Sequence, residues 1–242
     1  GADGKAYSID YQVGYITGQN DGIPEGMERC VTLTNRSTAT SASTQSGFFF
    51  SDKGIYMKEN TSSGTYTADG YKVINLACKR TGTNSSAAYF IEQSTSDPTS
   101  YRIMGTSAKR LSTPNVITSF TADGICMDGS SKFVETLNAN DVYYTYDNAI
   151  YRWSLTGKPS TTPSIRLPEG EIIRDIATNF KGKEKDSGGE EYLYVASYNP
   201  DRAGEKKGSL YIYRFSDETL VKSYEGVFDD PVSVVYKYRL SN

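Results

Sequence analysis

The chain has 242 residues, of which 37% are hydrophobic and 23% charged, with a formal net charge of −3 and a pI near 5.2. Lysine and arginine do not cluster, apart from a short mixed run near Lys181–Lys185, which argues against nucleic acid as a partner because phosphate binding needs a basic surface. No apolar run approaches the roughly 20 residues that a membrane-spanning helix needs. This length accommodates one large all-β domain or two smaller domains.

Histidine is absent from the sequence, which excludes Ser-His-Asp and Cys-His catalysis and His-ligated zinc. The three cysteines, Cys30, Cys78 and Cys126, form no C-x-x-C pair, and their odd number argues against a full disulfide framework. We expect them to be buried thiols outside disulfides. We predict no cofactor and no metal, since no Asp-x-Asp-x-Asp-Gly calcium loop occurs either.

Five segments share one pattern along the chain. Each of the last four has an apolar or aromatic strand, a turn rich in Asp, Asn, Gly or Pro, and a second strand with a tyrosine. The first segment begins at the turn itself, Asp3-Gly4. In chain order the segments are "GKAYSIDY" (4–11), "GFFFSDKGIYMKEN" (47–60), "AYFIEQSTSDPTSYRIM" (88–104), "VYYTYDNAIYRWSL" (142–155) and "YLYVASYNPDRAGEKKGSLYIYRF" (192–215).

Between these hairpins lie further β-like runs, which we assign to inner strands: 26–35, 71–78, 115–120, 171–180 and 231–239. Short outer runs such as 164–168 and 220–226 often precede them. The second-strand tyrosines recur at intervals of roughly 45–60 residues, so each repeat contains about four short strands. They are Tyr7, Tyr56, Tyr101, Tyr151 and Tyr211.

A period near 48 residues with four strands is typical of β-propeller blades. We therefore predict an all-β fold, a β-propeller of about five four-stranded units or part of a longer propeller. The units lie near 1–35, 36–78, 79–120, 121–180 and 181–242 of a single domain, 1–242. The alternative is a pair of β-sandwich domains, which also have many short strands but give no reason for the repeat.

The stretch "YYTYDNAIYRW" (143–153) has five aromatic residues around an Asp-Asn pair. It is either a ligand-stacking platform or a structural hairpin. Because a blade is packed on both faces by its neighbours, its middle strands should be apolar on both sides. We therefore interpret most of these aromatics as packing residues, and we expect the binding function of this hairpin at its tip, Asp147-Asn148.

The region that contains "SIRLPEGEIIRDIATNF" and "EEYLYVASYNPDRAGEKKGSLYIYRF" resembles the C-terminal region of the PKD-like lipoprotein family, most clearly over residues 143–239. These are exported surface proteins of glycan-foraging gut bacteria. The resemblance implies a lipid-anchored N-terminus, PKD-like modules and then a propeller, with adhesion or glycan binding as the activity. Neither the lipid-bearing cysteine nor the PKD-like modules occur in this sequence, and the resemblance transfers no catalytic residue.

In propellers, the loop between the two middle strands and the loop leading into the next inner strand share one face. Binding residues are expected on such loops because a rigid scaffold holds them. Asp229 and Asp230 lie in the loop that leads into the expected inner strand 231–239, and they would lie on the same face. The candidate binding residues are Asp52, Lys53, Asp97, Asp147, Asn148, Tyr198, Asn199, Asp201 and Arg202, the last four from the long insert 198–208.

We predict a non-catalytic binding or adhesion module at the cell surface, associated with a glycan or a surface protein. It is expected to be exported to the outer membrane surface or the periplasm, with a lipid anchor upstream of Gly1. The alternative is a propeller glycoside hydrolase, which needs two or three carboxylates on inner strands. The acids on or beside the assigned inner strands are Glu28, Asp123 and Asp175.

Overall fold

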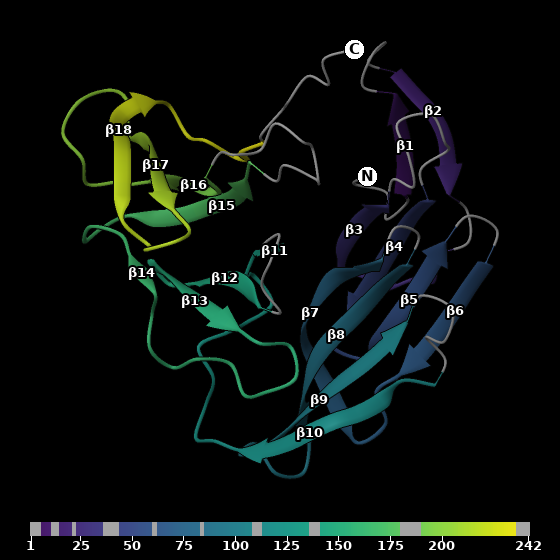
Figure 1. Cartoon of the computed structure of the whole chain (residues 1–242). Coiled ribbons are helices and arrows are strands. Elements are labelled where there is room, and N and C mark those ends of the chain that lie inside the picture. The colour runs from purple at the N-terminus through teal and green to yellow at the C-terminus, as the bar shows by residue number, and fades with distance from the viewer. Residues whose placement is uncertain are drawn as a thin grey trace. The chain divides into compact units, whose positions relative to one another are not determined.

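The structure is a computed structural model of the whole chain (Figure 1). It describes residues 6–10, 15–20, 23–35, 44–59, 62–82, 85–107, 113–135, 141–179 and 190–235. These residues form an all-β structure with four four-stranded antiparallel sheets and one two-stranded sheet, and none of them is helical. The described part of the chain accordingly has no helix that could span a membrane. The chain divides into two compact units, 1–123 and 124–242.

The first unit contains the two-stranded sheet and two four-stranded sheets. Strands β1 (Ala6–Asp10) and β2 (Tyr15–Asn20) pair with each other. Sheet 1 consists of β3 (Arg29–Asn35), β4 (Thr44–Ser51), β5 (Gly54–Glu59) and β6 (Ser62–Thr67). Sheet 2 consists of β7 (Tyr71–Gly82), β8 (Ser85–Ser94), β9 (Ser100–Ser107) and β10 (Asn115–Thr121). In both sheets the spatial order of the strands is their order in the sequence.

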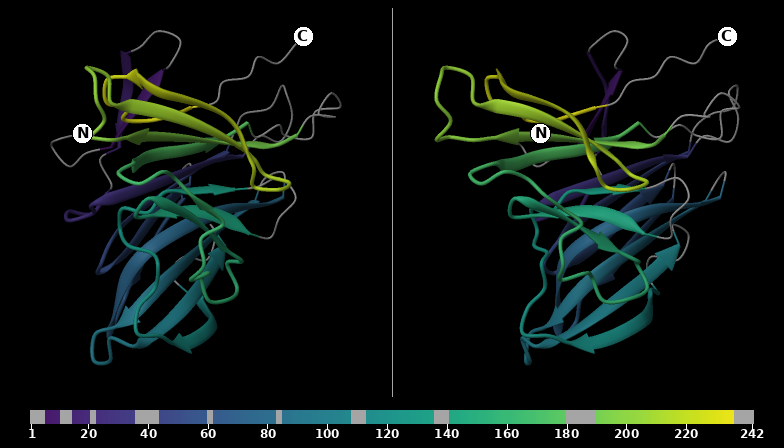
Figure 2. Two further views of the ribbon diagram at one scale, coloured as in Figure 1. Left: turned by 90° about the vertical axis from the view of Figure 1, so that its left-hand side faces the viewer. Right: turned by 60° about the vertical axis from the view of Figure 1, so that its left-hand side comes forward.

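The second unit has two sheets of the same design. Sheet 3 consists of β11 (Phe133–Glu135), β12 (Val142–Tyr146), β13 (Ala149–Trp153) and β14 (Ile165–Arg166). Sheet 4 consists of β15 (Ile172–Thr178), β16 (Tyr192–Tyr198), β17 (Gly208–Arg214) and β18 (Leu220–Phe228). Sheet 4 forms one twisted layer, green to yellow in Figure 2. Every neighbouring pair within the two sheets is antiparallel.

Each unit is held together by two sheets that pack against each other. In the first unit, one core combines side chains of sheet 1, such as Phe48 and Ile55, with side chains of sheet 2, such as Leu76 and Phe90. In the second unit, Ile150 of sheet 3 lies in one core with sheet 4 residues such as Leu193 and Tyr211. Burying each of these side chains fully contributes about 1.5–3 kcal/mol. The two-layer packing suits a β-sandwich as well as two adjacent propeller blades.

The predicted hairpins at 47–60, 88–104, 142–155 and 192–215 are confirmed as the pairs β4–β5, β8–β9, β12–β13 and β16–β17. The turn of the first requires glycine, because a Cβ on Gly54 would lie 2.2 Å from the carbonyl oxygen of Tyr66 on β6. In the third hairpin, Asp147 takes a positive φ of 54°, which Asp tolerates better than most residues. The Asp3-Gly4 turn lies outside the described residues.

The aromatic stretch at 143–153 is structural. Tyr144 and Trp153 are essentially fully buried, and Tyr143 and Tyr151 are buried as well. By contrast, most residues of the edge strands β10 and β18 are exposed or half-buried. The middle strands β12 and β13 are therefore covered on both faces, as predicted, whereas buried and half-buried residues partly alternate along β16 and β17.

Three expectations about local structure are wrong. Residues 115–120 belong to β10, the last strand of sheet 2, because a β-forming composition does not reveal a strand's place in its sheet. Residues 231–235 of the expected strand 231–239 form no strand, and 236–239 lie outside the described residues. None of the cysteines, all of which are described, forms a disulfide, but only Cys78 is buried, whereas Cys30 is exposed and Cys126 half-buried.

Candidate functional site

In the first unit, the turn of the β4–β5 hairpin lies beside the β6–β7 connection. The amide of Val73 donates to the carbonyl of Asp52 at 2.8 Å, and the amide of Ala68 donates to that of Lys53 at 2.9 Å. The β8–β9 loop reaches the same connection, since both the amide and the hydroxyl of Thr95 donate to Gly70 at 3.1 Å. Two hairpin tips and one inter-sheet connection thus meet at one end of this unit.

The second unit repeats this arrangement. The amide of Leu167 donates to the carbonyl of Asn148 at 3.0 Å, and the Arg166 guanidinium donates to the Asn148 side chain at 2.6 Å. The β12–β13 turn is thereby held against the β14–β15 connection. That connection also touches the β16–β17 loop. A Cβ on Gly170, whose φ is +83°, would lie 3.0 Å from the side-chain amide nitrogen of Asn199.

A buried glutamate, Glu171, lies at the centre of this loop cluster. Its side chain is 0% exposed and forms an ion pair with Arg202 from the β16–β17 loop. The Ser197 hydroxyl donates to its other oxygen at 2.6 Å, and the Tyr211 hydroxyl lies 3.2 Å from the oxygen that Arg202 contacts. Burial, followed by the charge of Glu171, raises the pKa of Tyr211 to about 12. This network connects two strands of sheet 4 with the loop between them.

The Arg202 guanidinium is committed to internal contacts, because it also donates to Glu225 on β18 at 3.1 Å. Its pKa is raised chiefly by the hydrogen bond to Glu171. Tyr198 is similarly occupied, since the Arg174 guanidinium lies 5.0 Å from the centre of its ring. Arg174 in turn pairs with Asp230 through two hydrogen bonds of 3.1 Å. Two of the candidate binding residues, Tyr198 and Arg202, therefore have structural partners.

The nine predicted residues are either exposed or half-buried, and some of the remaining ones also have partners within their own loops. Asn199 shapes its own loop, because its side chain accepts a hydrogen bond from the Asp201 amide at 3.0 Å. Asp97 accepts hydrogen bonds from the Thr99 hydroxyl at 2.7 Å and amide at 2.9 Å, which lower the pKa of its carboxyl. The exposed residues are Asp52, Lys53, Asp97, Asp147 and Asp201, and the half-buried ones are Asn148, Tyr198, Asn199 and Arg202.

Within each unit the structure brings the predicted residues to one end of the sheets. Asp52, Lys53 and Asp97 gather in the first unit, and the remaining six gather in the second. Sequence reasoning missed Glu171. Its neighbourhood, "LPEGEII", indicates an exposed acidic turn, and no local signal distinguishes the buried Glu171 from the exposed Glu169.

The three acids of the hydrolase alternative lie in different settings. Asp175 on β15 accepts hydrogen bonds from the Ser233 hydroxyl at 2.6 Å and from the Val234 amide at 3.0 Å. It thus anchors the segment after β18 to the first strand of sheet 4. Glu28 and Asp123 are exposed residues of the first unit. Among the described residues, no group of three or more Cys, Asp or Glu side chains could hold a metal ion.

No protein-family model matches the chain, and a search of curated proteins found no significant match.

Proposed function

We propose that this chain is a non-catalytic binding module built from propeller-type blades, and that its loop ends bind a glycan at the cell surface. Support for the blades comes from strand order. All four four-stranded sheets are simple meanders, whereas β-sandwiches of this size generally use Greek-key crossovers between sheets. Support for an exported, lipid-anchored protein comes from the resemblance of residues 143–239 to PKD-like surface lipoproteins.

The gathering of loops at one end of each unit is the observation that carries the binding proposal. Hydrogen bonds fix the hairpin tips against the inter-sheet connections, so the loops have a rigid base. Packing already occupies the aromatic side chains of the middle strands. Exposed carboxylates such as Asp147 and Asp201 remain for a ligand, and sugar hydroxyls are suitable donors to them.

A glycan array with the full chain tests this proposal. The double variant Asp147→Asn/Asp201→Asn removes two exposed charges but keeps one oxygen acceptor at each site. We expect its binding to fall severalfold, because hydrogen bonds to charged groups are the stronger ones. Arg202 is a poor choice for this test, since its loss would leave the buried Glu171 without its cation.

Asp217→Asn provides the matched control, because Asp217 is an exposed acid in the turn after β17, at the other end of that strand. We expect this variant to bind like the wild type. Absence of wild-type binding to every glycan on the array would contradict glycan binding itself. Equal binding by the double variant and the wild type would reject these loops as the site.

A further inference from the structure

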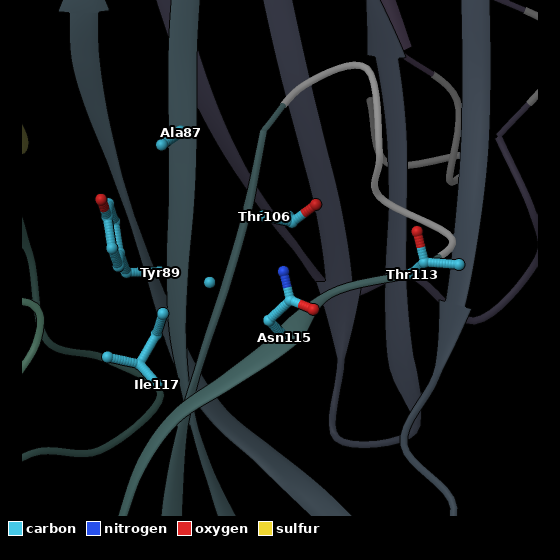
Figure 3. Close-up of a pocket in the computed structure, with 7 residues that line it drawn as sticks. Ala87, Tyr89, Thr106, Thr113, Asn115 and Ile117 are labelled. Atoms are coloured by element: carbon cyan, nitrogen blue, oxygen red, sulfur yellow. The ribbon is translucent and has the colours of Figure 1, made fainter.

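A pocket lies on sheet 2, away from the loop clusters described above. Its volume is about 310 Å³, at the small end of the roughly 300–1,000 Å³ range of ligand sites, and it is open to solvent on one side. Figure 3 shows Tyr89 and Ile117 on one side, with Asn115, Thr106 and Thr113 across from them. The pocket is lined by Ala87, Tyr89, Gly105, Thr106, Thr113, Asn115 and Ile117.

Strand register explains why a pocket forms here. Tyr89 on β8 pairs with Gly105 on β9, and Gly105 pairs with Asn115 on β10. Paired residues on neighbouring strands direct their side chains to the same face of a sheet. The row across the three strands is therefore an aromatic ring, a residue without a side chain, and an amide. Gly105 therefore places no side chain between Tyr89 and Asn115.

A β-bulge completes the wall. The β9–β10 register shifts between Val116 and Thr118, so that Ile117 has no partner on β9. Such bulges redirect a side chain. Ile117 lies directly over the glycine, since a Cβ on Gly105 would be 2.9 Å from its Cδ1 atom and 3.6 Å from Cδ1 of Tyr89. Glycine at position 105 thus allows Ile117 to pack closely over β9 and form one wall of the pocket.

The lining of the pocket is polar but uncharged. None of its seven residues carries a charge, yet the lining includes the phenol of Tyr89, the amide of Asn115 and the hydroxyl of the exposed Thr113. Among the described residues, neither the Tyr89 hydroxyl nor the Asn115 amide has a hydrogen-bond partner. An aromatic ring can pack against the C–H face of a sugar ring, while the amide can both donate to and accept from its hydroxyls. None of the seven described lining residues is a cation that could pair with a carboxylate, sulfate or phosphate.

We propose that this pocket binds one neutral sugar residue of a glycan. The inference rests on the proposed glycan-binding function and adds a second site with its own ligand class. Tyr89 provides the stacking surface and Asn115 the hydroxyl recognition, with Ile117 closing one side. The volume suits about one monosaccharide unit, and the open side allows the rest of the chain to continue into solvent.

The test uses an array of neutral gluco-, galacto- and manno-configured oligosaccharides beside sialylated and sulfated ones. The best neutral glycan is then titrated calorimetrically into the wild type and three variants. Tyr89→Ala removes the ring, Asn115→Ala removes the amide, and Gly105→Ala fills the floor and displaces Ile117 without removing a polar group. We expect each to weaken binding at least about tenfold. Ser119→Ala, on the same strand but outside the pocket, should bind like the wild type.

Because Tyr89→Ala could disturb the sheet, a measurement on the wild type accompanies the variants. Titration with the neutral glycan should shift the NMR signal of the Asn115 side-chain amide. An unshifted amide signal, or full affinity in all three variants, overturns the pocket but leaves glycan binding at the loops intact. Preference for acidic glycans overturns the neutral ligand class. A wild-type chain that binds no glycan overturns both proposals.

Discussion

Among the described residues, each unit has one buried glutamate that is paired with an arginine and a tyrosine, but the two units use it differently. In the first unit, Glu92 on β8 accepts hydrogen bonds from Arg102 on β9 at 2.6 Å and from Tyr66 on β6 at 3.2 Å. Since Tyr66 belongs to sheet 1, this cluster joins two sheets. In the second unit, all partners of Glu171 belong to sheet 4 or to its β16–β17 loop.

The two glutamates also differ in how fully they are satisfied. Both oxygens of Glu171 accept hydrogen bonds, whereas Oε1 of Glu92 has no partner among the described residues. An unpaired buried oxygen is costly, and Glu92 depends correspondingly more on its single cation. Arg102 is itself fixed by the Tyr71 ring, whose centre lies 3.5 Å from the guanidinium carbon. Equal burial of two carboxylates therefore does not imply equal tolerance to losing the cation.

Arg102→Ala should therefore be the most damaging change. It leaves Glu92, whose side chain is 0% exposed, with only the Tyr66 hydroxyl, and it removes the contact with Tyr71. We expect a loss of about 3–5 kcal/mol in the free energy of unfolding. Urea denaturation followed by far-UV circular dichroism measures it. The double variant Glu92→Leu/Arg102→Leu should recover part of the loss, because an apolar pair has no uncompensated charge; no recovery would contradict this explanation.

Arg202→Ala should cost less, about 3 kcal/mol, because the hydroxyls of Ser197 and Tyr211 still donate to Glu171. Trp153, the only tryptophan, is buried in the second unit, so tryptophan fluorescence during urea denaturation reports on that unit. Glu225→Ala, which breaks the more exposed pair with Arg202 and an exposed hydrogen bond from Ser223, should cost less than about 1 kcal/mol. A larger loss of stability for Arg202→Ala than for Arg102→Ala would contradict the expectation that Glu92 depends more on its arginine than Glu171 does.

The hairpins were predictable because each has local turn chemistry between two aromatic runs, as in Ser51–Gly54 and Tyr146–Ala149. Tertiary packing decides what the sequence could not show. Whether Glu171 is exposed depends on Ser197 and Arg202, which lie far along the chain. The pocket on sheet 2 arises from pairing Tyr89, Gly105 and Asn115 across three strands, and the one-residue bulge at Ile117 has no sequence signature. Loop placement could be predicted, but the partners of the loop side chains could not.

Alkaline titration should affect both clusters in the same pH range. Burial raises the pKa of Tyr66 to about 12, as it does for Tyr211, and the adjacent glutamate charge adds to it in each case. An unfolded tyrosine loses its proton near pH 10, while the folded one keeps it, so the stabilisation is complete below pH 10 and is lost as the pH rises to 12. With Tyr66→Phe, the free energy of unfolding measured by circular dichroism should fall less steeply with pH over this window. With Tyr211→Phe, the free energy of unfolding measured by Trp153 fluorescence should likewise fall less steeply with pH. If Tyr66→Phe weakens the pH dependence of the Trp153 transition as much as Tyr211→Phe does, the two units unfold together. The effects of all variants on stability must then be compared within one shared unfolding transition.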